Sequence, residues 1–172
     1  MKLWRLDPER AAEWRHIRLE ALRLAPESFS TLLHEWQDRP LADFAGRLAM
    51  GRVFAAGHMI GNPMATAGWH EDLTGSACIT GVYCRPEGRG QGFAAAVIGQ
   101  VEQDARAHGM TRSHLRVFKD NPQACSLYER AGYRVLPPQA GDDPRQFVME
   151  KPLQAYVAAR LPSPLEQGAG SG

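Results

Sequence analysis

The sequence predicts a mixed α/β fold, an α-β-α sandwich in which helices cover both faces of a mixed sheet. Segments with helical periodicity alternate along the chain with segments typical of strands. Several neighbouring strands are joined by short turns, such as 61–63 and 72–75, which indicates antiparallel pairs beside the parallel pairs that helical crossovers create. The predicted order of elements is βααβββαβαββ.

The N-terminal half begins with a predicted strand over 3–6. Asp7 followed by Pro8 indicates a helix start, with Asp7 as the N-cap and proline in the first helical position. We expect this helix to end before Pro26, and a loop to lead into a second, short helix that Pro40 opens. Three strands are then predicted, over 53–60, 64–70 and 77–84.

The C-terminal half begins with a helix over about 92–108, because apolar residues recur there at near-four spacing. Gly109 follows where a left-handed residue commonly ends a helix. Asn121 and Pro122 repeat the pattern of an N-cap followed by proline, and predict a helix that ends at Gly132. The remaining predicted strands are 113–118, 133–136 and 147–151, with a loop over 137–145.

The length suits one domain. Of the 172 residues, we assign 1–152 to the domain and 153–172 to a C-terminal extension. In that extension we expect a short helix over 153–161 and a disordered tail rich in proline, glycine, serine and alanine. The formal net charge of +1 excludes a strongly basic nucleic-acid binder, so no nucleic-acid partner is expected.

The cellular compartment is predicted from the cysteines and the N-terminus. The three cysteines, Cys78, Cys84 and Cys125, include no C-x-x-C pair and fit neither a disulfide framework nor a zinc ribbon. We therefore expect no bound metal, and a location in the reducing cytoplasm. The N-terminus turns polar too early for a signal peptide. The longest apolar run, 93–98, is far shorter than a membrane span, so no membrane partner is expected.

The most informative segment is the glycine-rich turn at 89–94, between a buried strand and an amphipathic helix. Glycine lets the backbone bend tightly and approach a ligand, and the first amides of a helix lack internal partners. Such a turn can bind phosphate or pyrophosphate, and Arg89 adds a positive charge there. A plain strand-to-helix turn is the alternative interpretation.

Two other phosphate-binding motifs are alternatives for this turn. A Walker A motif is excluded because the chain contains no Gly-Lys-Ser/Thr. A dinucleotide fingerprint matches superficially at Gly90, Gly92 and Ala95, with Asp120 ending the next strand. The lengthened turn at 86–88, the strands that precede it and the short remainder of the chain argue against that fingerprint.

The turn and a later segment together resemble the GNAT superfamily of N-acetyltransferases. Arg89, Gly92 and Ala94 match the family's acetyl-CoA-binding pattern Arg/Gln-x-x-Gly-x-Gly/Ala. The segment 121–133, which contains Leu127-Tyr128 and ends in Gly132-Tyr133, resembles the second family signature. The resemblance covers about 2–152 and implies a GNAT-like, mostly antiparallel sheet of six to seven strands. Relatives are often dimers, which leaves a homodimer open.

The resemblance implies acetyl-CoA as acyl donor. The amides of 90–94 would hold its pyrophosphate, and its pantetheine arm would pair with the strand at 82–84 where this strand diverges from 113–118. A backbone N–H near Tyr83 or Cys84 would bind the acetyl carbonyl. The residues implied to bind acetyl-CoA are Val82, Tyr83, Cys84, Arg89, Gly90, Gln91, Gly92, Phe93, Ala94, Asn121 and Ala124.

The resemblance also implies a catalytic residue, Tyr128, as the acid that protonates the leaving thiolate. Without the family, Tyr128 would be interpreted as a core residue on an apolar helix face. The general base is left open, because 77–84 contains no carboxylate where some relatives place a glutamate. The candidates are His70, Glu71, Asp72 and His114, with a water chain as the alternative.

The acceptor is expected to be an amine bound near the loop between the first two helices. Phe29 and Trp36 could line that site, and Glu27, Glu35 and Asp38 could attract a cationic amine, although solvated loop charges explain them better. The leading hypothesis is an N-acetyltransferase that works by direct transfer in a ternary complex. The alternatives are a non-catalytic CoA-binding module and a nicotinamide-nucleotide oxidoreductase.

Overall fold

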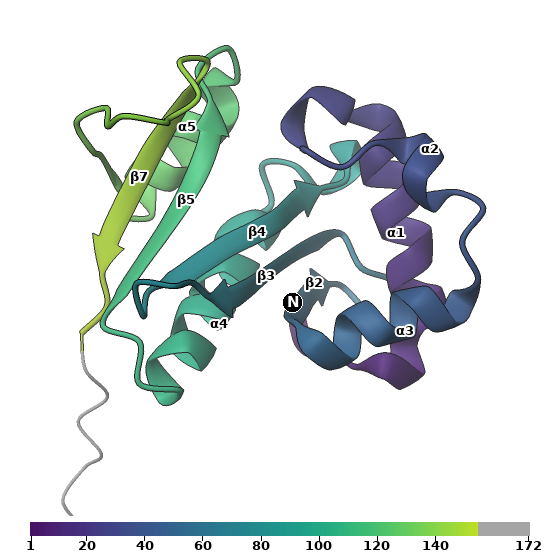
Figure 1. The fold of residues 1–172 in the computed structure, drawn as a ribbon. Coiled ribbons are helices and arrows are strands. Elements are labelled where there is room, and N and C mark those ends of the chain that lie inside the picture. Colours follow the sequence, from purple (N-terminus) through teal and green to yellow (C-terminus); the bar gives the residue numbers. More distant parts are fainter. Residues whose placement is uncertain (155–172) are drawn as a thin grey trace, which may run out of the picture.

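The computed structural model describes residues 1–154, and the predicted helix and tail beyond Leu153 lie almost wholly outside the described residues. Twelve helices and strands occur in the described part (Figure 1). They are β1 (Lys2–Leu6), α1 (Ala11–Leu24), α2 (Leu33–Trp36), α3 (Leu41–Met50), β2 (Arg52–Gly57), β3 (Ala65–Glu71), β4 (Ala77–Cys84), α4 (Phe93–Ala107), β5 (Arg112–Phe118), α5 (Pro122–Arg130), β6 (Arg134–Val135) and β7 (Gln146–Pro152).

The strands form one mixed sheet, which confirms the predicted fold class. Its seven strands lie in the order β1-β2-β3-β4-β5-β7-β6. All neighbours are antiparallel except β4 and β5, which are parallel because α4 connects them. The sheet is therefore mostly antiparallel, with one parallel contact at its centre.

Helices cover both faces of this sheet, and each face has its own apolar core. On one face, α4 and α5 pack on the sheet around Phe93, Val101, Leu115 and Met149. On the other, α1, α2 and α3 enclose a cluster that includes Phe44 and Leu48. Three aromatic rings of this second core, those of Trp14, Trp36 and Phe44, meet edge to face at centroid distances of 5.0–6.5 Å.

The parallel pair β4–β5 opens into a splay. Only Ala77 pairs with Ser113 and Cys78 with His114, and beyond Cys78 the two strands separate. Figure 1 shows β4 and β5 diverging from this closed end toward the end of the sheet where α5 begins. The backbone edge of β4 over 79–84 therefore has no strand partner on the β5 side.

Several local details differ from the sequence prediction. Within residues 1–154, Asp7 accepts no cap hydrogen bond and its buried Oδ1 has no partner, because a short 3-10 turn over Pro8–Arg10 precedes α1. The first predicted strand after α3 ends at Gly57 and not at 60. The loop before Pro40 contains the single-turn helix α2, which is too short for periodicity to detect. Asn121 does cap α5, since its Oδ1 accepts the Ala124 amide at 3.1 Å.

The closed end of the splay is held by Asp72 in the β3–β4 turn. Its Oδ1 accepts the Thr74 amide at 2.8 Å, the Thr74 hydroxyl at 2.7 Å and the Ser76 amide at 3.0 Å, while its Oδ2 lies 2.6 Å from Nε2 of His114 on β5. These bonds, those from Thr74 and Ser76 foremost, hold the pKa of Asp72 well below its usual value.

Asp72→Asn should lower the free energy of unfolding by about 1 kcal/mol at pH 7, because the carboxylate is partly exposed. A depressed folded-state pKa contributes stability that is fully present above the ordinary carboxyl pKa of about 4. That contribution is lost progressively as the pH falls from there through the lower folded-state pKa. Urea unfolding of both proteins at pH 7 and pH 3 tests this. The difference between them should be smaller at pH 3 than at pH 7, because part of the contribution is lost once the unfolded-state carboxyl is protonated. A difference that does not change with pH would contradict the assignment.

No helix among residues 1–154 is long and apolar enough to cross a membrane.

Candidate active site

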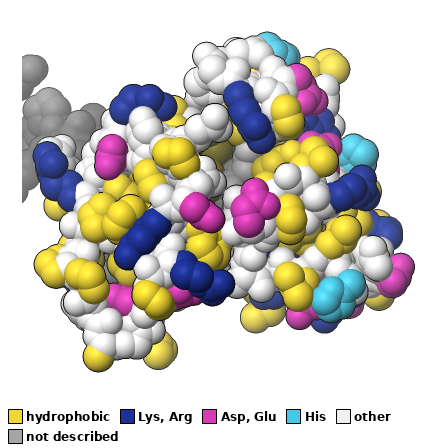
Figure 2. Space-filling view, turned by 90° about the horizontal axis from the view of Figure 1, so that it is seen from above, with side chains coloured by type: hydrophobic (Ala, Val, Ile, Leu, Met, Phe, Trp, Pro, Cys, Tyr) yellow, Lys and Arg dark blue, Asp and Glu magenta, His cyan; other side chains and the backbone are white. Residues whose placement is uncertain are grey.

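Two cavities meet where β4 and β5 diverge. One, the turn cavity, has a volume of about 990 Å³ and is lined by the end of β4, the turn at 88–94 and α5. The other, the arginine cleft, has a volume of about 800 Å³ and is lined by α1, the segment 28–31, β2, β3, β4 and β5. Seen from above, the surface is hollowed between the two halves of the molecule (Figure 2). Both cavities are lined by Ser28, Phe29, Val82, Asn121, Ala124 and Tyr128.

The glycine-rich turn forms the mouth of the turn cavity. Gly92 begins α4 with a φ of +83°, and Gly90 has a φ of +74°, a backbone region that residues with a Cβ rarely adopt. Glycine at both positions lets the chain turn so that the N-terminal amides of α4 lie at the cavity. Arg89 is exposed beside them, and its Nε donates to the Cys84 carbonyl at 3.4 Å.

The sequence-predicted binding residues cluster at this cavity. All of them except Gln91 line it, although they come from β4, the turn, α4 and α5. The Gln91 side chain instead closes the turn, because its Nε2 donates to the Glu87 carbonyl at 2.7 Å. The arrangement provides backbone donors, the Arg89 guanidinium and an open strand edge, which fits an elongated ligand with a phosphate group.

Tyr128 lies on α5 at the junction of the two cavities. Its side chain is 7% exposed, and its ring packs edge to face on Tyr133 with centroids 6.1 Å apart. Within residues 1–154 its hydroxyl makes no hydrogen bond, and it is not among the fully buried atoms that lack a partner. Burial raises the pKa of Tyr128 well above its usual value. The hydroxyl is thus protonated and has no partner within residues 1–154, on a residue that lines both cavities, whereas the hydroxyl of a buried core tyrosine is usually hydrogen-bonded.

The arginine cleft contains two of the residues expected at the acceptor site, Phe29 and Trp36. The three acidic residues considered there, Glu27, Glu35 and Asp38, are exposed and do not line it. The Glu35 carboxylate instead accepts the Leu32 amide at 2.7 Å at the start of α2. These acids are best explained as solvated or capping groups.

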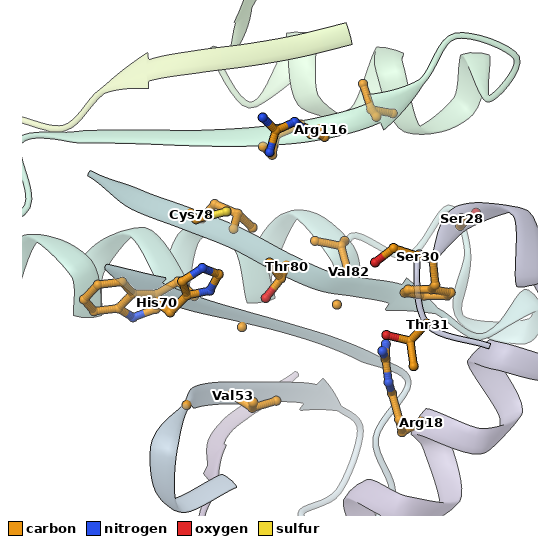
Figure 3. Close-up of a pocket in the computed structure, with 18 of the residues that line it drawn as sticks. Arg18, Ser28, Ser30, Thr31, Val53, His70, Cys78, Thr80, Val82 and Arg116 are labelled. Carbon is orange, nitrogen blue, oxygen red and sulfur yellow. The ribbon is translucent and has the colours of Figure 1, made fainter. Parts of the chain in front are cut away.

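Of the four candidate bases, only His70 lines the arginine cleft, where Figure 3 shows its ring beside the strand that carries Thr80. Glu71, Asp72 and His114 line neither cavity. The last two are engaged with each other at the closed end of the splay.

None of the three cysteines has the lowered pKa of an activated nucleophile. Cys78 lines the arginine cleft and Cys84 the turn cavity, whereas Cys125 lines neither. Burial raises the pKa of all three thiols, so they stay protonated near neutral pH.

A part-buried ion pair that sequence reasoning missed anchors the end of β4. Arg85 is 7% exposed, and its Nε lies 2.9 Å from Oε1 of Glu20 on α1, while its Nη1 donates to Asn62 Oδ1 at 3.2 Å. Glu20 also accepts the Tyr83 hydroxyl at 3.2 Å. Burial, with the Glu20 carboxylate next, raises the pKa of Tyr83 to about 12. The network fixes α1 against the strand that lines both cavities.

A bulge in β4 was also missed. The β3–β4 register shifts between Thr66 and Gly68, opposite Gly81, whose φ is +64°. A glycine inside a strand pattern is a usual sign of a bulge, so this signal was present in the sequence. The bulge lies next to Val82, in the part of β4 whose opposite edge has no partner on the β5 side.

Comparison with known proteins agrees with this geometry. The model of the acetyltransferase (GNAT) family matches residues 12–133, which is more than half of the chain. The chain belongs to the GNAT acetyltransferase family. A curated acetyltransferase from Pectobacterium atrosepticum is 34% identical over 80 residues, a match that covers 46% of this chain and 53% of that protein. The chain thus spans about half the length of this curated relative.

Solved structures share the GNAT fold. A GNAT acetyltransferase from Streptococcus pneumoniae superposes with a TM-score of 0.73 at 15% identity, covering 88% of this chain and 98% of the other. An N-acetyltransferase from Thermoplasma acidophilum, solved in complex with coenzyme A, has a TM-score of 0.70 at 15% identity with the same coverage. A putative acetyltransferase from Salmonella typhimurium, solved with acetyl-CoA, has a TM-score of 0.67 at 19% identity and covers 92% and 96%.

Proposed function

We propose that this protein is an N-acetyltransferase that moves an acetyl group from acetyl-CoA to a primary amine while both are bound. The observation that carries the proposal is the meeting of two cavities at Val82 and Tyr128, in the splay between β4 and β5. One cavity can hold the donor and the other the acceptor, so that their reacting groups meet without a covalent enzyme intermediate.

The donor is proposed to lie in the turn cavity. The amides at the start of α4 and the Arg89 guanidinium are suited to its pyrophosphate. The open edge of β4 at Val82 and Cys84 offers backbone hydrogen bonds to the amide groups of its pantetheine arm, as an added strand would receive them. Asn121 and Ala124 on α5 form the opposite wall.

The transfer needs an acid for the leaving group, and we assign that role to Tyr128. The amine nitrogen forms a bond to the acetyl carbonyl carbon, and the carbon–sulfur bond breaks. The thiolate takes the hydroxyl proton of Tyr128, and the nitrogen releases one proton to water, from which the tyrosine regains its own. A backbone N–H near Tyr83 or Cys84 stabilises the charge that develops on the carbonyl oxygen.

The proton acceptor is proposed to be water in the arginine cleft, and the positive charge of the cleft assists the proton loss. The cleft is lined by arginines and His70, and no carboxylate of the described chain lines it. A positive environment lowers the pKa of a bound ammonium, since like charges disfavour the charged form. The amine can then lose its proton to solvent without a strong base.

Calorimetry tests the donor site. Acetyl-CoA and CoA should bind and NADH should not. Gly92→Ala should weaken acetyl-CoA binding about tenfold or more, because a Cβ disfavours the φ of +83° and alters the amides at the start of α4. Gly46→Ala is the control, since Gly46 lies on α3 with open space around it and lines neither cavity. Equal affinity in the Gly92 variant, or tight NADH binding, would contradict the donor assignment.

A further inference from the structure

The walls of the arginine cleft carry positive charge from several elements. Arg18 comes from α1, Arg47 from α3, Arg52 from β2 and Arg116 from β5. Figure 3 shows Arg18 and Arg116 on opposite sides of the strand that carries Thr80 and Val82. No aspartate or glutamate of residues 1–154 is among the lining residues. The charge of the cleft is therefore not balanced from within its own walls.

Only one of these arginines has an acidic partner in the described chain. Arg52 lies 3.3 Å from Asp104. Within residues 1–154, Arg18, Arg47 and Arg116 form no salt bridge, and Arg18 and Arg47 lie over the rings of Phe29 and Trp36, at 4.8 and 5.3 Å from the ring centroids. Burial, and next the charge of Arg47, lower the pKa of Arg18 to about 10, so it remains a cation at neutral pH.

Arg18 is the arginine placed next to the transfer point. Its Nη1 lies 4.0 Å from the position that a Cβ on Gly81 would occupy, so its guanidinium reaches the bulge of β4. The next residue, Val82, lines both cavities. A group bound to Arg18 is thus a short distance from the junction where Tyr128 lies.

We infer that the acceptor is a small amine that also carries a carboxylate, such as an amino acid, and that Arg18 is the residue that binds this carboxylate. This rests on the proposed function. A planar guanidinium binds a carboxylate through two parallel hydrogen bonds, and a half-buried cation without an acidic partner gains most from such a ligand. The same charges repel polyamines, so the cleft selects against cationic acceptors. A volume of about 800 Å³ suits a small molecule.

The test compares amine acceptors that carry a carboxylate, a neutral amide, a phosphonate or a second amine. Thiol release from acetyl-CoA is measured with L-amino acids, their amides, aminoalkylphosphonates and diamines. For the wild type, kcat/KM should be about 10- to 100-fold higher for the best amino acid than for its amide, and lowest for diamines. If a phosphonate is preferred over every amino acid, the assignment of a carboxylate ligand is wrong, and the cleft is only a general anion site.

Arg18→Gln should remove most of this preference, mainly by raising KM for the amino acid. Arg23→Gln is the matched control, because Arg23 lies exposed on the same helix and lines neither cavity. Retention of acetyl-CoA affinity in the Arg18 variant shows that the fold is intact. The inference would be overturned if the wild type showed no preference for the amino acid over its amide. It would also be overturned if the Arg18 variant lost activity equally with both acceptors.

A binding measurement separates this inference from the proposed function. With the protein saturated with CoA, N-acetylalanine should bind at least tenfold more tightly than N-acetylalaninamide, and Arg18→Gln should abolish the difference. If no amine is acetylated but this difference holds, the transferase proposal fails and the carboxylate site stands. If amines are acetylated but the two probes bind equally, the carboxylate site fails alone.

Discussion

Tyr128→Phe should lower kcat about 100-fold or more and leave the Kd for acetyl-CoA within about twofold, as expected for loss of a general acid. The variant keeps the ring and its packing on Tyr133, so only the hydroxyl at the cavity junction is removed. Because burial raises the pKa of Tyr128, the wild type should show no loss of activity from its ionisation below about pH 10. Steady-state kinetics and calorimetry measure both quantities.

Tyr133→Phe is the matched control. Its ring adjoins that of Tyr128, but its hydroxyl bonds to the Ser113 hydroxyl at 2.9 Å and lines neither cavity. This variant should lose about 1 kcal/mol of stability and keep its turnover. Unchanged turnover in the Tyr128 variant, or equal losses in both variants, would remove Tyr128 from the transfer step.

Glu20→Ala should lower the free energy of unfolding by about 3–5 kcal/mol, because it leaves Arg85 as a buried cation without its acidic partner. Tyr83 loses a hydrogen-bond partner at the same time. Urea unfolding measures the loss, and Glu129→Ala is the control because Glu129 is exposed on α5. A double variant, Glu20→Leu with Arg85→Met, should be more stable than Glu20→Ala alone. A loss below about 1 kcal/mol in Glu20→Ala would contradict this role.

The sequence was most informative where structure depends on local chemistry. The helix that became α4 was predicted from the spacing of its apolar residues and from glycine at either end. Asn121 was predicted as a cap because a side-chain oxygen there can reach an amide three residues later, and it does. The turn at 89–94 was predicted as a binding element for the same reason, since its glycines and helix amides are adjacent in the chain.

The contacts that could not be predicted from the sequence are those between segments far apart in the chain. Glu20 and Arg85 are 65 residues apart, and nothing in the pattern around either one indicates the other. The four arginines of the cleft come from four elements, and each is an ordinary polar residue in its own segment. The divergence of β4 from β5 was expected only from the family resemblance, because no local signal tells how far two parallel strands stay paired. Charge in the cleft therefore became visible only in the assembled sheet.

The central claim is direct transfer from acetyl-CoA to an amine at the junction of the two cavities. The most direct measurement follows free CoA thiol and N-acetylated product together, with acetyl-CoA and a panel of amino acids. Release of thiol only when amine is present, with one acetylated amine formed for each thiol, is the predicted result. Acetyl-CoA that binds but yields neither thiol nor acetylated amine with any acceptor would contradict the claim and indicate a non-catalytic CoA-binding protein.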